Sequence, residues 1–156
     1  MSFAVVENWV EAPLRRFVDD ARVLLALILH PSGQVLAQSG FTRAVDVMSA
    51  CALAAGIHAS AGELGKMLDG KPFGGLHHAG RERQIYLAPA STQRATYIVL
   101  AVFDQASSLG LVQLYFRELQ QSLAAAAPAP VEQKPVLATN FEGELNRNLA
   151  VLFGRA

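Results

Sequence analysis

The chain has 156 residues and a mass of 16.7 kDa, enough for one globular domain with modest appendages whose core needs neither disulfides nor a structural metal. Hydrophobic residues make up 52% and charged residues 17%, a balance that excludes a disordered chain and is typical of a domain that hides part of its surface in an oligomer. Lys plus Arg and Asp plus Glu number 13 each, with no concentrated basic run, so no nucleic-acid partner is expected.

The single cysteine, Cys51, cannot form an internal disulfide, and the first residues lack the basic start, apolar core and small-residue cleavage site of a signal peptide. We therefore expect a cytoplasmic protein. The longest apolar run, Val23 to Leu29, is far shorter than the roughly 20 residues that span a bilayer, so direct insertion into a membrane is not expected.

Apolar residues near the N-terminus recur at helical spacing and predict an amphipathic helix. These residues are Val6, Val10, Leu14, Phe17 and Val18. Pro13 falls inside the pattern, where it would lose a backbone hydrogen bond and clash with the preceding turn. We expect the regular helix to begin at Pro13, behind a looser segment.

The run Val23 to Leu29 is apolar on both faces, which predicts a central strand covered on each side. The triplet Pro31-Ser32-Gly33 then breaks the run, and Gln34 to Gln38 resumes a short strand. Because the connection has hairpin length, the two strands are expected to be antiparallel neighbours.

A long helix is predicted from Ala44 to Leu68, with large apolar residues separated by many small ones. The large residues are Val45, Met48, Leu53, Ile57, Leu64 and Met67, and the small ones are Ala50, Ala52, Ala54, Ala55, Gly56, Ala59, Ala61 and Gly62. So little bulk allows another backbone to approach closely. Each interior glycine costs about 1 kcal/mol relative to alanine, which calls for a compensating contact. Packing on the chain's own sheet would provide one, and small residues on both faces favour contacts on two sides.

Three strands separated by turns are predicted next, at 73–79, 83–88 and 96–103, with polar or turn-forming connections at 80–82 and 89–94. A further helix follows, for which Ser107 or Ser108 can act as the N-cap. Its apolar face consists of Leu109, Val112, Phe116, Leu119 and Leu123.

The folded domain is predicted to cover residues 1–126, followed by a Pro/Ala-rich linker at 127–139 and an amphipathic helix at 140–156. The apolar stripe of this last helix is Phe141, Leu145, Leu149, Leu152 and Phe153. The helix is too short to be stable alone in water, so it must dock. Its own domain and a partner protein are both possible sites for it.

The predicted order, αββαβββα, resembles the roadblock/LC7 family. The segments VLLALILHPSGQVLAQSG and YIVLAVFDQASSLGLVQLYFRELQQSL are similar to that family's characteristic stretches, and the match covers Pro13 to Ala126. In the first segment, Pro31-Ser32-Gly33 stands where the family has a charged residue before the turn glycine. The resemblance implies an α+β sandwich around a central five-stranded antiparallel sheet, with a C-terminal amphipathic helix added here.

The resemblance also implies a homodimer that pairs through the long helix and the following strand and joins two sheets into one. The positions here that would form this interface are Ala52, Ala55, Gly56, Ala59, Phe73, Gly75 and His77. Among bacterial members the chain is most similar to the MglB type, which activates GTP hydrolysis by a small Ras-like (MglA-like) GTPase in polarity and motility signalling. Its predicted tail is similar in placement to the tail those proteins use on their GTPase, which makes the same five tail residues candidates for partner binding: Phe141, Leu145, Leu149, Leu152 and Phe153.

No catalytic, cofactor-binding or metal-ligating set is predicted, because the sequence has no phosphate loop, nucleophile elbow or metal-spaced Cys/His cluster. His77 and His78 are adjacent and would point to opposite faces of a strand. Cys51, among alanines, is expected to be a small buried residue. Four arginines lie in or near loops without a distinctive context: Arg43, Arg81, Arg83 and Arg94. We therefore expect a regulatory binding protein that is not itself an enzyme.

Two other functions are compatible with the sequence. A dimeric scaffold could tether a larger assembly without altering any hydrolysis rate. A small-molecule sensor of the PAS or GAF type would also combine an antiparallel sheet with helices, but it would require a roomy interior pocket.

Overall fold

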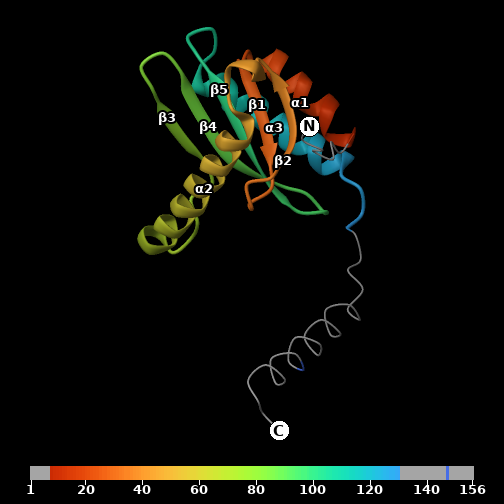
Figure 1. Ribbon diagram of the computed structural model, residues 1–156, viewed down its shortest axis with the longest axis vertical. Coiled ribbons are helices and arrows are strands. Elements are labelled where there is room, and N and C mark those ends of the chain that lie inside the picture. Colours follow the sequence, from red (N-terminus) through yellow and green to blue (C-terminus); the bar gives the residue numbers. More distant parts are fainter. Residues whose placement is uncertain (1–7, 131–146, 148–156) are drawn as a thin grey trace.

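The computed structural model describes residues 8–130 and residue 147, and it shows three layers (Figure 1). A five-stranded antiparallel sheet, in the order β2-β1-β5-β4-β3, forms the middle layer. Helices α1 and α3 pack on one face, and α2 lies on the other. This is the predicted α+β sandwich with the predicted order of elements.

The element bounds agree with most of the expectations. The helices are α1 at Asn8–Ala21, α2 at Val47–Asp69 and α3 at Leu109–Ala126, with a short 3-10 helix, η1, at Thr42–Ala44. The strands are β1 at Leu25–Leu29, β2 at Val35–Gly40, β3 at Leu76–Ala79, β4 at Gln84–Ser91 and β5 at Thr96–Phe103. The fifth strand has its predicted bounds, and the hairpin of β1 and β2 is confirmed by their antiparallel register.

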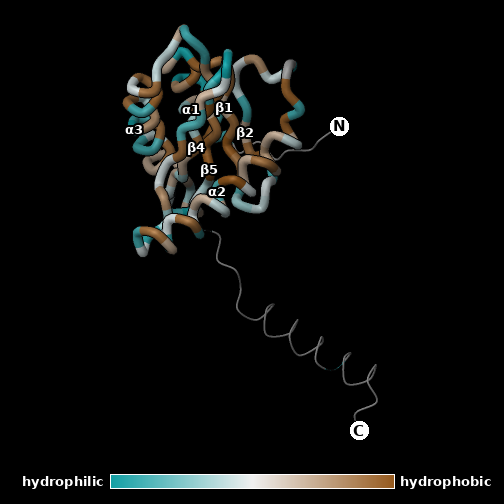
Figure 2. The backbone as a smooth tube through the Cα atoms, turned by 90° about the vertical axis from the view of Figure 1, so that its left-hand side faces the viewer, coloured by the Kyte–Doolittle hydropathy of each residue, from teal (hydrophilic) through white to brown (hydrophobic). Residues whose placement is uncertain are grey.

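The centre of the sheet is the most apolar part of the domain, as the hydropathy colours in Figure 2 make visible. All five residues of β1 are buried, as expected for a strand covered on both faces. β1 lies between β2 and β5, so its alternate side chains enter two cores, one beneath α1 and α3 and one beneath α2.

The expectation that α1 begins at Pro13 is wrong, because the helix extends back to Asn8 with Pro13 inside it. An interior proline costs about 3 kcal/mol or more. Val10 and Leu14 flank the proline, and both are fully buried against the sheet. Each such side chain contributes roughly 1.5–3 kcal/mol when it leaves water, so packing on both sides offsets the lost hydrogen bond.

The expectation that 89–94 is a turn is wrong at its start, because Pro89 lies within β4 and pairs with Ile98 of β5. β3 pairs with β4 only from Gln84 to Leu87. At Pro89 the neighbouring strand has therefore ended, and the missing N–H of proline breaks no ladder bond. The carbonyl of Pro89 instead accepts a hydrogen bond from the Gln120 side chain, at 3.1 Å.

Helix α2 begins later than predicted, because η1 occupies Thr42–Ala44 and Asp46 serves as the N-cap. The Asp46 carboxylate accepts hydrogen bonds from the Ser49 backbone at 3.2 Å and from the Ser49 hydroxyl at 2.8 Å. Gly70, in the left-handed conformation with φ of 74°, ends the helix.

Helix α3 is capped by Ser108, one of the two predicted serines, and buries four of its five predicted apolar positions: Val112, Phe116, Leu119 and Leu123. Beyond its last turn, the Ala127 carbonyl accepts a hydrogen bond from the Gln93 side chain at 2.7 Å. The predicted tail helix at 140–156 lies outside the described residues, apart from Arg147.

Candidate interaction surface

The outer side of α2, which faces away from the sheet, carries most of the exposed apolar bulk of the described residues. Six of the eight large hydrophobic residues that are exposed belong to this helix: Met48, Leu53, Ile57, Leu64, Met67 and Leu68. Met67 is 81% exposed and Leu53 69% exposed. So many exposed large apolar residues on one helix are typical of an interaction site.

The sheet side of α2 is built from small residues, in agreement with the expected packing of this helix on the chain's own sheet. Cys51, Ala54 and Ala55 are buried against the strands, so the helix lies close to the sheet. Burial raises the pKa of the Cys51 thiol to about 11, which keeps the side chain protonated and inert. The prediction of Cys51 as a small buried residue is confirmed.

The predicted interface residues of α2 divide between these two sides. Ala52, Gly56 and Ala59 lie exposed on the outer side, among the large apolar residues, and a Cβ added at Gly56 would meet no atom within 4 Å. Ala55 differs from the expectation, since it is only 8% exposed and belongs to the core beneath the helix.

Strand β3 forms one edge of the sheet and pairs only with β4 among the described strands (Figure 1). The Gly80 N–H donates to the Arg83 carbonyl at 2.8 Å, so Gly80 directs its backbone groups towards β4. Because this direction alternates along a strand, Leu76 and His78 also bond to β4, while His77 and Ala79 direct their N–H and C=O groups outward. The edge is therefore open for pairing with another strand.

The remaining predicted interface residues lie at the start of this edge. Phe73 is half-buried against Gly65 of α2, and Gly75 is exposed beside the Tyr86 ring. His77 is exposed, stacks on Phe103 at a ring-centroid distance of 6.1 Å, and contacts the Gln84 side chain through Nε2 at 2.8 Å. Phe73 therefore borders α2, whereas Gly75 and His77 lie on the α1 and α3 side of the sheet.

Two surface grooves were not predicted from the sequence. One, of about 350 Å³, lies between α3 and β4 and is lined by residues that include Tyr86, Pro89 and Arg117. The other, of about 260 Å³, is lined by Leu24, Leu25, Phe41, Arg83 and Val102 on the α2 side of the sheet. Both are open at the surface, and neither is the enclosed interior pocket that a PAS- or GAF-type sensor would need.

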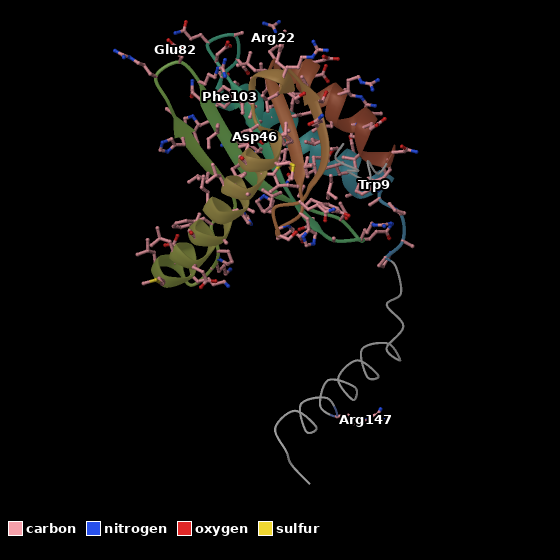
Figure 3. The ribbon with its side chains drawn as sticks, viewed as in Figure 1. Trp9, Arg22, Asp46, Glu82, Phe103 and Arg147 are labelled. Carbon is pink, nitrogen blue, oxygen red and sulfur yellow. The ribbon has the colours of Figure 1, made fainter. Side chains whose placement is uncertain are left out.

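The structure gathers no catalytic constellation from the residues it describes. Within 8–130 and 147, no group of three or more His, Cys, Asp or Glu side chains is placed to hold a metal ion. Of the four loop arginines, Arg43, Arg81 and Arg83 are exposed and Arg94 is half-buried. The hairpin between β3 and β4 projects Glu82 at its tip, well away from the N-cap Asp46 of α2 (Figure 3).

By length and composition alone, α2 is also the one helix of the described part of the chain that is long and apolar enough to cross a membrane. Its small residues pack on the sheet, however, and its outer side is interrupted by charged residues such as Glu63 and Lys66, which form a 3.1 Å ion pair. The apolar character of α2 is therefore accounted for by one side that packs on its own sheet and another that is suited to a protein partner.

Comparison with solved structures identifies the fold. The chain resembles Myxococcus xanthus MglB, with a TM-score of 0.68 and 26% identity over 74% of this chain and 92% of that one. It resembles the gliding protein MglB of Thermus thermophilus with a TM-score of 0.68 and 22% identity, over 81% of this chain and 94% of that one. A roadblock/LC7 domain of Streptomyces avermitilis has a TM-score of 0.59 and 17% identity, over 74% and 92% of the two chains.

No protein-family model and no curated protein sequence matches the chain. The likeness is therefore carried by structure, and it confirms the predicted roadblock/LC7 fold in its MglB-like form.

Proposed function

From the MglB-like roadblock/LC7 fold of this chain, we propose that it is a cytoplasmic homodimeric regulator that binds a small Ras-like GTPase and stimulates its GTP hydrolysis in polarity or motility signalling. The observation that carries the proposal is the apolar outer side of α2 next to the open edge of β3. The resemblance of the fold to MglB supplies the class of partner.

The apolar area on α2 favours a dimer on energetic grounds. Each large apolar side chain contributes roughly 1.5–3 kcal/mol when it is fully buried, and six are exposed on this one helix. A second copy can cover them because Ala52, Gly56 and Ala59 leave space for a close helix approach between them.

The same surface selects the geometry of the dimer. An antiparallel pairing of two β3 strands has its twofold axis perpendicular to the sheet, which places both α2 helices on one face of a joined ten-stranded sheet. A parallel pairing would place them on opposite faces and leave both apolar sides in water. Contact between the two α2 helices therefore requires the antiparallel arrangement.

Activation of a GTPase by this protein would work through shape. The described residues include no group of three or more His, Cys, Asp or Glu side chains placed to hold a metal ion, and their loop arginines lie in η1 (Arg43), between β3 and β4 (Arg81 and Arg83) and between β4 and β5 (Arg94). A dimeric surface that holds the GTPase's own catalytic groups in line with the γ-phosphate would accelerate hydrolysis without donating a group. The predicted tail stripe, Phe141, Leu145, Leu149, Leu152 and Phe153, would add a second contact to the same partner.

The test is phosphate release from a GTP-loaded Ras-like GTPase of the same organism, with and without this protein. We expect a stimulation of about tenfold or more, which corresponds to about 1.4 kcal/mol of barrier lowering. Leu53→Glu on α2 should abolish both stimulation and dimer formation. Leu114→Glu is the matched control, since Leu114 is 52% exposed on α3, in the opposite layer, and its replacement should change neither property.

Absence of binding, together with unchanged hydrolysis and nucleotide exchange, would overturn the proposal. The scaffold remains the second candidate, because the exposed apolar side of α2 accounts for binding without requiring any change in a hydrolysis rate. Binding of the GTPase with unaltered turnover would select the scaffold.

A further inference from the structure

Symmetry restricts how two β3 edges can pair. Directly opposite side chains of an antiparallel pair point to the same face, and a twofold axis perpendicular to the sheet maps each face onto itself. A residue of one chain can therefore face only a residue of the second chain whose number differs from its own by zero or by an even number. It follows that the axis lies level with a residue of the strand and never between two consecutive residues.

The strand has four residues, Leu76–Ala79, so its midpoint lies between His77 and His78. Symmetry forbids that midpoint, and the nearest permitted centres are the two histidines themselves. If the axis lies at His77, the outward N–H and C=O groups of His77 bond to those of His77 in the second copy. If the axis lies at His78, His77 bonds to Ala79 of the second copy. Both registers use the outward groups of the edge.

We infer that two identical histidines, one from each copy, face each other across the axis of the dimer and make its assembly sensitive to pH. The inference rests on the homodimer proposed above. Opposed residues in antiparallel strands have Cβ atoms about 4.5–5.5 Å apart, so two imidazolium rings there would repel each other. A neutral pair, or one with a single proton, can share a hydrogen bond instead.

The groups around the two histidines differ between the two faces of the sheet. His78 lies on the α2 face beside Ile85, and Arg83, which directly precedes β4, lies on the same face. Helical spacing places His58, which is half-buried, on the sheet side of α2.

His77 lies on the opposite face, where Tyr86 is its partner in β4 and Phe103 stacks on its ring. Arg117 of α3 lines the same groove as Tyr86. Among the described residues, no carboxylate forms an ion pair or a hydrogen bond with either histidine, since His77 contacts the neutral side chain of Gln84. No opposite charge in this set therefore offsets the repulsion of a doubly protonated pair.

The sign of the pH dependence follows from linkage. Two facing imidazolium rings repel each other, so the dimer binds fewer protons than the two separated chains. Association therefore weakens as the pH falls through the range in which imidazole side chains gain a proton. If the facing pair retains one proton in the dimer, the dissociation constant of the dimer should rise roughly 5-fold between about pH 7.5 and about pH 5.5. If the pair retains none, the rise should be roughly 100-fold.

Sedimentation equilibrium of the full chain across this pH range tests the inference. Replacing the histidine on the axis by glutamine should remove most of the pH dependence, so His77→Gln and His78→Gln are compared. His30→Gln is the matched control, because His30 is exposed in the turn between β1 and β2, and its replacement should leave the dependence intact.

Cysteine substitution determines the register directly. His77→Cys and His78→Cys are prepared as separate variants and oxidised. Only the variant whose cysteine lies on the axis should form a disulfide between the two copies, because only that residue faces the same residue of the second copy within disulfide range. Ala79→Cys, off the axis in both registers, should not form the link, and the parent chain should not form it through buried Cys51.

The outcomes separate the two proposals. A chain that is monomeric at every pH would contradict the homodimer. A dimer whose dissociation constant is unchanged between about pH 7.5 and about pH 5.5, or whose pH dependence survives in both glutamine variants, would overturn the histidine pair and leave the homodimer standing.

Discussion

Gly65 has no side chain, and this lets the loop between α2 and β3 pack directly on the helix. A Cβ at this position would lie 2.5 Å from the Phe73 backbone nitrogen and 2.8 Å from the Lys71 carbonyl oxygen. The glycine therefore allows the loop after α2 to fold back tightly against the helix. This contact sets where β3 begins relative to α2.

We predict that Gly65→Ala destabilises the domain by about 1–3 kcal/mol, even though alanine is the better helix former by about 1 kcal/mol, because the backbone must move to admit the methyl group. Gly62→Ala is the matched control on the same helix, where the added Cβ would meet only Pro72, at an ordinary 3.9 Å. That variant should be neutral or more stable by up to about 1 kcal/mol. Urea unfolding at one fixed protein concentration measures both, and equal effects would contradict this reading of Gly65.

Single-residue expectations from the sequence held where the chemistry is local. Cys51 is buried, and Ser108 caps α3. They failed for proline, because the cost of Pro13 and of Pro89 depends on neighbours distant in sequence. Buried contacts around Pro13, and the early end of β3 beside Pro89, decide those positions.

At the scale of elements, α2 depends on its N-cap. The hydrogen bonds from Ser49 lower the pKa of Asp46 below its usual value of 3.8. A carboxyl group whose pKa is lower in the folded chain than in the unfolded chain stabilises the folded state. This stabilisation is complete above the pKa of the group in the unfolded chain, and it is lost as the pH falls through the pKa of the group in the folded chain. The start of α2 should therefore weaken only in acid, below about pH 4.

We predict that Asp46→Ala lowers the urea midpoint at neutral pH, while Asp46→Asn, which keeps an oxygen acceptor for the Ser49 N–H, lowers it much less. Because the wild-type carboxylate loses its charge in acid, the difference between wild type and Asp46→Asn should shrink at about pH 3. A difference that stays constant with pH would mean that the charge of Asp46 does not stabilise the helix.

The elements themselves were largely predictable, since β5 and the apolar face of α3 follow from β-branched content and helical spacing. The role of the two sides of α2 was not. Its large and small residues are interleaved, so periodicity does not distinguish the side that faces the sheet. Only the structure shows that Cys51 and Ala54 face inward while Leu53 and Ile57 face outward.

At the scale of the whole molecule, the open edge of β3 can be tested without disturbing the fold. Ala79 directs its N–H away from β4, so Ala79→Pro removes a donor that the chain's own sheet does not use. We predict a folded monomer, with the dimer dissociation constant raised by about tenfold or more, as measured by sedimentation equilibrium.

His78→Pro is the contrasting variant, because His78 bonds to β4, and its loss should lower the thermal midpoint of the domain itself. Dimerisation of Ala79→Pro with unchanged affinity would exclude β3 as the edge that pairs.

The exit of the chain from α3 has a practical consequence. Ala127 is held by Gln93 at the end of the layer formed by α1 and α3, so the C-terminal end of α3 lies on the side of the sheet opposite α2. A fluorescent protein or affinity handle fused to a chain shortened after Pro130 would therefore leave the α2 side clear for imaging and capture. An insertion into the 70–75 loop would instead obstruct it.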